Sequence, residues 1–361
     1  MSLAGGLSPL ATAHATLLAW LATLVGQALR LTIVMLRDSG VSEELIDGKV
    51  ALVFPGQGSQ FVGMGLELAA MSPAAKRVLD QADAILGFPL TDIMFQGPAE
   101  ILEDTINAQP AILAASVAAL EAMQERLAEQ GKRITPALVA GHSLGEFTAL
   151  VAAGSLDYPE ALRLVRERGR LMREAGERRP GGMAAVLGLD DDVLAEVCRE
   201  ASAAGVVVLA NANCPGQTVI SGEVQALERA MALAKERGAK RVTRLGVSIA
   251  SHSPLMQDAS AQFAAVVAHT PLREPAVPVV ANVSAEPMTD VAGIREELSR
   301  QIASPVNWTG SVRRMIEEGV TTFIELGPGQ VLTGLIKRID RSVQAVGLGD
   351  LGLGLPPVVA R

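Results

Sequence analysis

The sequence has few of the residues that build metal sites, disulfide frameworks or aromatic cores. Its 361 residues include two cysteines, four histidines and 3% aromatic side chains. Cys198 and Cys214 lack metal-like spacing, which indicates a reducing compartment, and we expect the cytoplasm. With so few histidines we expect no metal site. The core must be built mainly from Ala, Val, Leu and Ile.

Positive charge is scarce relative to negative charge. The chain has 31 Lys and Arg against 39 Asp and Glu, a net charge of −8. Nucleic-acid binding relies on Lys and Arg that neutralise phosphates, so nucleic acid is not expected as the main partner. The composition, 49% hydrophobic and 19% charged, supports a sizeable core in one large domain or two smaller ones.

Charged residues are missing from residues 3–29, and residues 17–36 are strongly apolar apart from Arg30. The length would suit a membrane span, but the segment lacks the basic region of a secretory signal. Three interpretations of residues 1–48 stay open: a misassigned start with Met35 as another initiator, a membrane-associating helix, or an appendage. We expect an appendage outside the chemistry, and membrane binding only if residues 1–48 act as an anchor.

The sequence Gly-His-Ser-Leu-Gly at 141–145 lies between an apolar run, 134–140, and a segment that is predicted to be helical, 146–153. A strand, a Gly-x-Ser-x-Gly turn and a helix form a nucleophile elbow, in which a Cβ on either side of the serine would not fit. Ser143 would then lie at a helix N-terminus, where free N–H groups favour negative charge. A chance Gly-rich turn is the alternative, and the flanking strand and helix favour the elbow.

From residue 49 onward, short apolar strands alternate with helices, which predicts an α/β protein with a mostly parallel sheet. Residues 179–246 show the order βαββαβ of a ferredoxin-like unit. We expect a core from 49–178 and 247–345, a ferredoxin-like small domain at 179–246, and a Gly/Pro-rich tail at 346–361. A core strand is also predicted at 277–282.

Ser143 needs a base, and elimination among the four histidines points to His252. His142 leaves the turn in another direction, His269 ends a helix where it can bind carbonyls, and His14 lies outside the folded body. His252 lies where the chain returns to the core after the small domain. A loop histidine that is satisfied by its neighbours is the alternative.

Two further features belong to the candidate site. The Gly-rich loop at 55–60 follows a strand, and its N–H groups suit an oxyanion, so the N–H groups of Gln57 and Leu144 form a natural pair. No aspartate is assigned to His252, because a backbone or amide oxygen can orient the imidazole equally well. One arginine of the helix at 159–175 could bind an anionic substrate, and the residues alone leave four candidates open: Arg163, Arg166, Arg168 and Arg170.

Together these motifs resemble the malonyl-CoA:acyl carrier protein transacylases, the acyltransferases of bacterial fatty-acid synthesis. The resemblance runs from about residue 49 to residue 339. It rests on six segments in the same order: FPGQGSQ at 54–60, GHSLGE at 141–146, RG at 168–169, NANCPGQ at 211–217, SHSPLM at 251–256 and ELGPG at 325–329.

The resemblance implies an α/β-hydrolase-like core and residue roles that the residues alone leave open. It also implies that malonyl-CoA and phosphopantetheinylated acyl carrier protein are the substrates and that no cofactor is used. The implied roles are Ser143 as nucleophile, His252 as base, Gln57 and Leu144 as oxyanion donors through backbone N–H, Arg168 as partner of the malonyl carboxylate, the Gln301 backbone carbonyl as the group that orients the histidine, and Asn213 at the cleft edge.

Other functions stay open: a serine hydrolase or thioesterase, an acyltransferase of polyketide synthesis, or a scaffold without catalysis. Ser251 before His252 resembles polyketide enzymes that use methylmalonyl, whereas Leu144 fits malonyl enzymes, and we expect malonyl. Basic residues of the small domain are candidates for carrier docking, with a solvated surface as the alternative: Lys235, Arg237, Lys240, Arg241 and Arg244.

Overall fold

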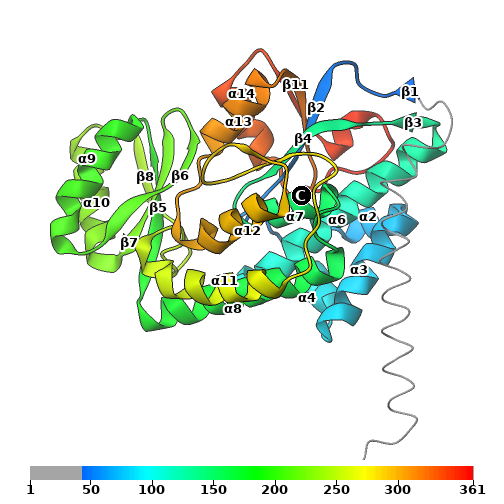
Figure 1. The fold of residues 1–361 in the computed structure, drawn as a ribbon. Helices are drawn as coiled ribbons and strands as arrows, with labels where there is room; N and C mark the ends of the chain where they lie inside the picture. Colours follow the sequence, from blue (N-terminus) through cyan, green and yellow to red (C-terminus); the bar gives the residue numbers. More distant parts are fainter. Residues whose placement is uncertain (1–42, 361) are drawn as a thin grey trace, which may run out of the picture.

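The computed structural model describes residues 43–360. The expectations for residues 1–42 lie outside the described residues. The described chain is an α/β protein with a mixed, mainly parallel sheet and a second, antiparallel sheet (Figure 1). A further short parallel pair joins β1 (Glu43–Glu44) to β3 (Lys132–Arg133).

The large sheet has the strand order β10-β9-β4-β2-β11-β12. All its neighbours are parallel except β10 and β9. The parallel strands therefore end at one edge, where open α/β sheets bind ligands. Its strands are β2 (Lys49–Phe54), β4 (Pro136–Gly141), β9 (Val279–Val280), β10 (Pro287–Met288), β11 (Val320–Glu325) and β12 (Gln344–Gly347).

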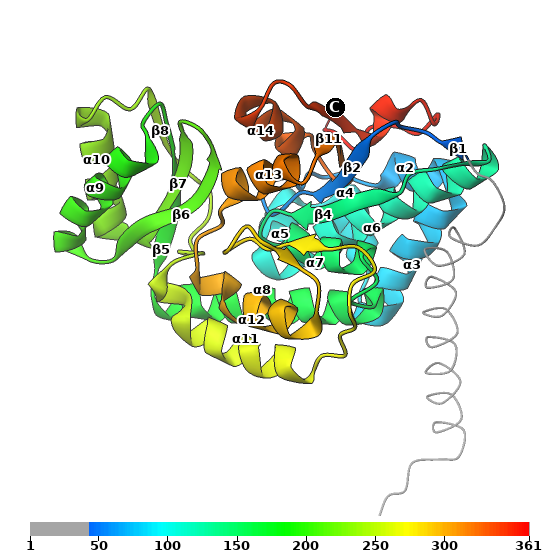
Figure 2. The same ribbon diagram turned by 45° about the horizontal axis from the view of Figure 1, so that its top comes forward.

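Helices cover both faces of the large sheet (Figure 2), which explains why its strands are continuous apolar runs. Along β2, Leu52 and Phe54 contribute to one core and Ala51 and Val53 to the other. The first core contains α3 (Pro73–Leu86), α6 (Thr105–Glu129), α7 (Gly145–Ala152), α8 (Tyr158–Arg178), α11 (Gln257–His269) and α12 (Val291–Arg300), and the second contains α13 (Trp308–Glu317) and α14 (Val331–Ile339).

Shorter helices complete the large unit. α2 (Leu66–Met71), α4 (Leu90–Gln96) and α5 (Ala99–Glu103) pack around α3 and α6. The 3-10 turns are η1 (Ser202–Ala204), which follows α9, and η2 (Pro254–Met256), η3 (Gln301–Ala303) and η4 (Leu348–Leu351).

The second sheet has the order β6-β7-β5-β8 and is antiparallel throughout. α9 (Asp191–Ala201) and α10 (Val224–Glu236) pack on it and form a separate core. Val306, in the segment before α13, connects to this second sheet. Its N–H donates to Ala210 O, and its carbonyl accepts from Ala212 N. The strands of the second sheet are β5 (Gly181–Leu187), β6 (Val207–Cys214), β7 (Gln217–Glu223) and β8 (Arg241–Arg244).

Helix α6 is the one described helix that is long and apolar enough to cross a membrane by length and composition. Of its most apolar window, 89% is buried inside the protein. That burial is typical of a core helix, and α6 packs against α3, α7 and α8.

The structure differs in detail from two expectations for the C-terminal part. The strand expected at 277–282 is reduced to β9, because Pro278 has no N–H for the ladder and Asn282 turns away to bind the elbow. The Gly/Pro-rich segment 346–361, expected as a tail, packs on the core over its described part. It begins within β12, and four of its apolar side chains are buried against the core: Leu348, Leu353, Leu355 and Val358.

Candidate active site

The turn between β4 and α7 has the geometry of a nucleophile elbow. Ser143 lies at a left-handed φ of 51°, which is strained for a residue with a side chain. A Cβ added at Gly141 would lie 1.9 Å from the Gly145 carbonyl carbon, and one added at Gly145 would lie 2.1 Å from Phe54 O. The two glycines are therefore required by close packing, and the turn presents Ser143 at the N-terminus of α7.

His252 reaches Ser143 from the segment before η2. Its Nε2 lies 2.8 Å from Ser143 Oγ, and its Nδ1 lies 3.0 Å from both Gln301 O and Ser304 O. Two carbonyl acceptors on Nδ1 require a proton there, so Nε2 is free to accept from the serine. Burial and the charge of Arg168 lower the pKa of His252 to about 3, which keeps the imidazole neutral at pH 7.

Arg168 extends from α8 into the same site, and only 1% of its surface is exposed. Its Nη2 donates to Ser143 Oγ at 3.2 Å and to Gln301 Oε1 at 2.9 Å, and its Nη1 donates to Gln109 Oε1 at 2.9 Å. Burial lowers its pKa to about 10, so the guanidinium remains charged at neutral pH.

The structure separates Arg168 from the other three arginines of the helix. Arg163 pairs with Glu160, and Arg170 pairs with Glu167 and Glu174, all on α8 itself. Arg166 donates to Ile106 O and Asn107 Oδ1 and lies over the ring of Phe88. Of the four, only Arg168 lies within hydrogen-bond distance of Ser143.

Two backbone N–H groups in the elbow and in the loop after β2 have no acceptor among the described residues. Ser143 N itself donates to Asn282 Oδ1 at 2.6 Å. Within residues 43–360, the N–H groups of Gln57 and Leu144 donate to no protein acceptor. Gln57 lies in the exposed loop after β2, next to the strand that carries the elbow.

Three residues that hold this site were not identified from the sequence: Glu146, Asn282 and Gln109. Glu146 Oε1 accepts from Asn282 N and Nδ2, and its Oε2 accepts from Gln301 Nε2. The pKa of Glu146 is raised well above its ordinary value, because burial and the nearby Glu297 raise it by more than these hydrogen bonds lower it. The one signal in the sequence is a charged residue in an otherwise apolar helix.

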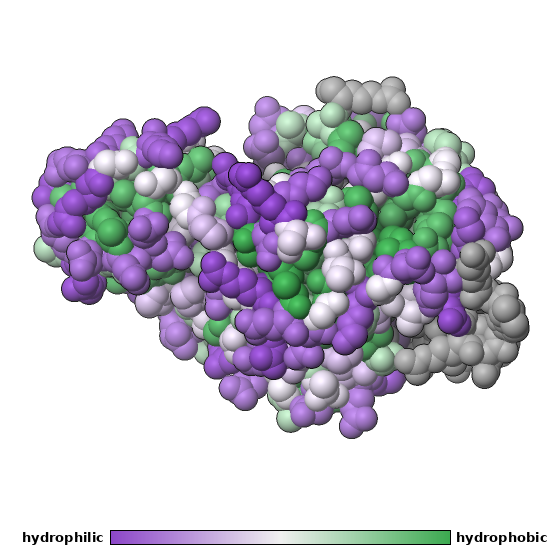
Figure 3. All heavy atoms as spheres, turned by 90° about the horizontal axis from the view of Figure 1, so that it is seen from above, coloured by the Kyte–Doolittle hydropathy of each residue, from purple (hydrophilic) through white to green (hydrophobic). Residues whose placement is uncertain are grey.

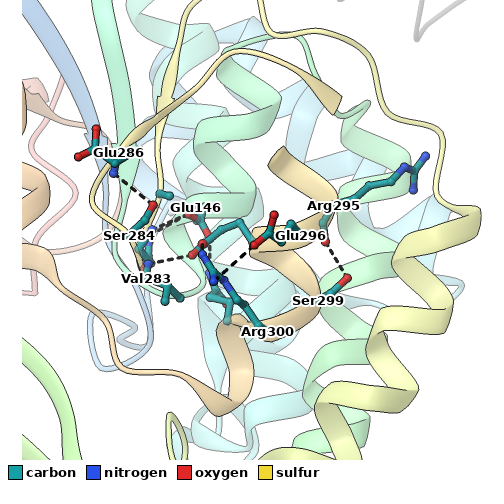
Figure 4. A network of polar contacts seen from close by, with 12 residues as sticks. Glu146, Val283, Ser284, Glu286, Arg295, Glu296, Ser299 and Arg300 are labelled. Atoms are coloured by element: carbon teal, nitrogen blue, oxygen red, sulfur yellow. Dashed lines mark hydrogen bonds and ion pairs between the residues drawn. The ribbon is translucent and has the colours of Figure 1, made fainter. Parts of the chain in front are cut away.

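The network around Glu146 continues into α12 (Figure 4). Glu297 Oε1 accepts from Val283 N at 2.9 Å, and Arg300 lies 3.5 Å from Glu296 and 3.7 Å from Glu297. The loop after β9 is thereby tied to both the elbow helix and α12. Asn282 and Gln301 both donate to the carboxylate of Glu146.

The remaining sequence candidates make no hydrogen bond to Ser143 or His252 among the described residues. Asn213 Oδ1 is 2.8 Å from His142 Nε2 and makes no contact with the pair Ser143–His252. His142 packs against Trp308, in agreement with a structural role, and His269 bonds Ala265 O at the end of α11. Among residues 43–360, no group of three or more His, Cys, Asp or Glu could hold a metal ion.

The fold and the site define a class: proteins in which a serine on a nucleophile elbow, paired with a histidine, carries an acyl group. The model of the acyl transferase domain family matches residues 51–348. The chain belongs to this family, in the branch of the malonyl CoA-acyl carrier protein transacylases, as the similarities to individual members show.

Individual relatives are similar over almost their full length. The malonyl CoA-acyl carrier protein transacylase of Bacillus subtilis is 48% identical over 303 residues, 84% of this chain and 94% of the relative. The enzyme of Escherichia coli K12 is 47% identical over 300 residues, 83% of this chain and 96% of the relative.

Solved structures agree with this assignment. The transacylase from Xanthomonas oryzae has a TM-score of 0.79 at 47% identity, covering 83% of this chain and 94% of that one. A malonyl-transacylase in complex with its type II PKS acyl-carrier protein has a TM-score of 0.78 at 43% identity, covering 83% and 95%.

Proposed function

We propose that this protein transfers the malonyl group from malonyl-CoA to the phosphopantetheine thiol of acyl carrier protein, through a malonyl-serine intermediate, in fatty-acid synthesis. One observation carries the proposal. A neutral His252 accepts from Ser143 Oγ at 2.8 Å, while the buried cation of Arg168 lies 3.2 Å from the same oxygen. The site therefore combines a nucleophile with a partner for an acidic acyl group.

In the first half-reaction, Ser143 Oγ attacks the thioester carbonyl of malonyl-CoA and its proton passes to His252 Nε2. The carbonyl oxygen becomes an oxyanion that the N–H groups of Gln57 and Leu144 hold. Removal of one such donor typically costs about 2.7–4 kcal/mol of transition-state stabilisation. The C–S bond then breaks, CoA takes the proton from His252, and malonyl-serine remains.

In the second half-reaction, the carrier's thiol gives its proton to His252 and its sulfur attacks the ester carbonyl. The C–O bond to Ser143 breaks, and Oγ recovers the proton from His252. The Gln301 and Ser304 carbonyls hold the imidazole in place through both halves, because both accept from Nδ1. A backbone acceptor thus takes the place of the acid of a triad.

Arg168 selects the acyl group. Malonyl has a free carboxylate that a guanidinium can bind, whereas acetyl would leave the buried cation unpaired. Sites that are built to bind a polar group of the substrate can reject analogues without that group by a factor of roughly 10⁴–10⁵ in kcat/KM. The reaction needs only the two acyl carriers as substrates and no cofactor, and we place it in the cytoplasm.

We infer an α/β-hydrolase-like core from 49–178 and 247–345 with a ferredoxin-like insertion at 179–246. The antiparallel order β6-β7-β5-β8, with both helices on one core, supports the second part, because a βαββαβ chain gives this order. Asn213 would then mark the insertion's side of the cleft.

Intact-mass spectrometry tests the function directly. Purified protein is exposed briefly to malonyl-CoA, acetyl-CoA or methylmalonyl-CoA, with Ser143→Ala as the matched control. We expect a malonyl adduct on the wild type, little adduct from acetyl-CoA, and none on Ser143→Ala. Absence of an adduct from every donor would contradict the catalytic proposal, and an adduct that persists in Ser143→Ala would remove Ser143 as nucleophile.

A further inference from the structure

The guanidinium of Arg168 is surrounded by neutral acceptors. Two side-chain amides, Gln109 and Gln301, accept from Nη1 and Nη2 at 2.9 Å each. The third acceptor is the hydroxyl of Ser143. The nearest carboxylate in this network belongs to Glu146, which is reached only through the amide of Gln301. No carboxylate among residues 43–360 binds the guanidinium directly.

Close helix packing brings Gln109 to Arg168. A Cβ added at Gly169 would lie 2.8 Å from Thr105 O and 2.9 Å from Ile106 Cα, so α8 approaches α6 closely at this point. Gln109 follows one helical turn after Thr105 on α6 and is fully buried. Its side chain therefore meets Arg168 one turn beyond this close approach of the two helices.

A chain of hydrogen bonds fixes which end of the Gln109 amide faces the arginine. Gln109 Nε2 donates to Thr105 Oγ1 at 2.9 Å, and Thr105 Oγ1 donates to Gln57 Oε1 at 3.0 Å. The amide nitrogen is thus used on Thr105, which leaves Oε1 for Arg168 Nη1. A glutamate would have the same shape at this position and would accept the same hydrogen bond, but it would add a negative charge.

The guanidinium has an unused hydrogen-bond donor, and among residues 43–360 no carboxylate is bound directly to it. Its Nε is buried and donates to no partner among the described residues. A buried cation without a counter-ion is costly, and a partner that brings a negative charge removes that cost. The protein places a charge-neutral amide where an ion pair would satisfy Arg168 permanently.

We propose that Gln109 is a specificity-determining residue: it holds the guanidinium of Arg168 without neutralising it, so that the acyl group must supply the negative charge. This inference rests on the proposed malonyl transfer and names the residue that keeps the site dependent on an acidic acyl group. The amide acts on Arg168 and does not touch the reacting atoms.

Gln109→Glu tests the proposal, because it changes charge and preserves shape. We measure the rates at which malonyl-CoA and acetyl-CoA acylate Ser143, by quenched-flow intact mass, and compare their ratio. The internal carboxylate of Gln109→Glu should lower the malonyl-to-acetyl ratio of rates by at least about tenfold. A loss of about 1.4 kcal/mol in the pairing of malonyl with Arg168 corresponds to that change. Gln262→Glu, which adds the same charge on the exposed surface of α11, should leave the ratio unchanged.

Gln109→Met separates charge from positioning. It removes the hydrogen bond without adding charge, so the rates can fall but the malonyl-to-acetyl ratio should stay within about threefold of the wild type. An equal loss of the ratio in Gln109→Met and Gln109→Glu would overturn the proposal, since positioning alone would then explain it. If Gln109→Glu does not fold, as judged by circular dichroism, Gln109→Met decides alone: a retained ratio supports the proposal and a tenfold loss overturns it.

Arg168→Ala, measured beside these variants, distinguishes a failure of the proposed function from a failure of the role proposed for Gln109. If the wild type forms no malonyl adduct, the proposed function fails. If the wild type prefers malonyl, Arg168→Ala loses that preference, and Gln109→Glu keeps the wild-type ratio, only the role of Gln109 fails.

Discussion

Burial sets the protonation of each side chain in the site. His252 is buried beside a cation, and both effects disfavour its charged form and lower its pKa to about 3. Arg168 is buried too, yet its pKa of about 10 leaves it charged. A neutral base and a charged arginine thus coexist around one serine, which is the protonation state that acylation by an acidic thioester requires.

This assignment predicts an unusual pH dependence for acylation. A general base must be unprotonated, so a pKa of about 3 keeps His252 active far below the ordinary histidine value of 6.5. The rate of Ser143 acylation should therefore show no acid limb near pH 6.5. In Arg168→Ala the repulsive charge is removed, the pKa of His252 rises, and an acid limb should move up towards neutrality.

Single-turnover rates over a pH series, with acetyl-CoA for both proteins, measure this shift. An acid limb at pH 6.5 in the wild type would contradict the low pKa. The same pKa affects stability: between about pH 3 and 6.5 the unfolded chain binds more protons at this residue than the folded chain. The contribution of His252 to the free energy of unfolding therefore decreases as the pH falls through that range.

Sequence patterns identified residues whose role is visible in a local motif. Ser143, with glycines on both sides, is such a residue, and elimination among four histidines pointed to His252, whose Nε2 lies 2.8 Å from Ser143 Oγ. Gln109 and Glu146 were not found, because their partners lie 59 and 155 residues away, at Arg168 and Gln301. No local pattern records a contact of that kind.

At the level of secondary structure, the site depends on how closely β2, β4 and α7 approach. Gly145 begins α7 directly above the end of β2, where its missing Cβ makes room for Phe54 O. The strand–turn–helix unit was predictable, since alternating apolar runs and glycines define it. The short length of β9 was not predictable. The apolar composition of residues 277–282 favours a longer strand, but Pro278 has no N–H for strand pairing and Asn282 binds the elbow instead.

Two glycine substitutions test this packing. Gly145→Ala should lower the free energy of unfolding by more than about 3 kcal/mol and abolish acylation, because the new methyl would overlap a backbone oxygen. Gly334→Ala, in the exposed face of α14 with no atom within 4 Å of the new Cβ, should raise it by about 0.5–1 kcal/mol. Urea unfolding measures both, and a Gly145→Ala protein of wild-type stability would refute the tight elbow.

At the level of the whole molecule, two units with separate cores face each other, and the smaller one projects from the side of the larger (Figures 1 and 3). In the view of Figure 3, hydrophilic residues line the margin of this unit and apolar residues lie between them. Among the ion pairs of residues 43–360, Arg237 pairs with Glu200 and Arg244 with Glu228. That leaves Lys235, Lys240 and Arg241 as the basic residues of this unit that can attract an acidic partner.

Charge reversal of these three residues to Glu tests whether they bind the carrier. The KM for acyl carrier protein should rise by roughly tenfold, since three exposed pairs are each worth about 0.2–1 kcal/mol, and the KM for malonyl-CoA should stay constant. Lys76→Glu with Arg77→Glu on α3, on the other side of the molecule (Figure 1), is the control. Equal changes for both substrates would remove this docking surface.

In the proposed reaction, the acyl group passes from Ser143 to the thiol of a carrier. The most direct measurement follows the mass of malonylated protein, freed of malonyl-CoA, with and without holo acyl carrier protein. We predict that the adduct is stable in water and moves rapidly to the carrier, which gains one malonyl mass as Ser143 is freed. Discharge into water at the same rate with and without the carrier would identify a hydrolase and contradict the proposed transfer.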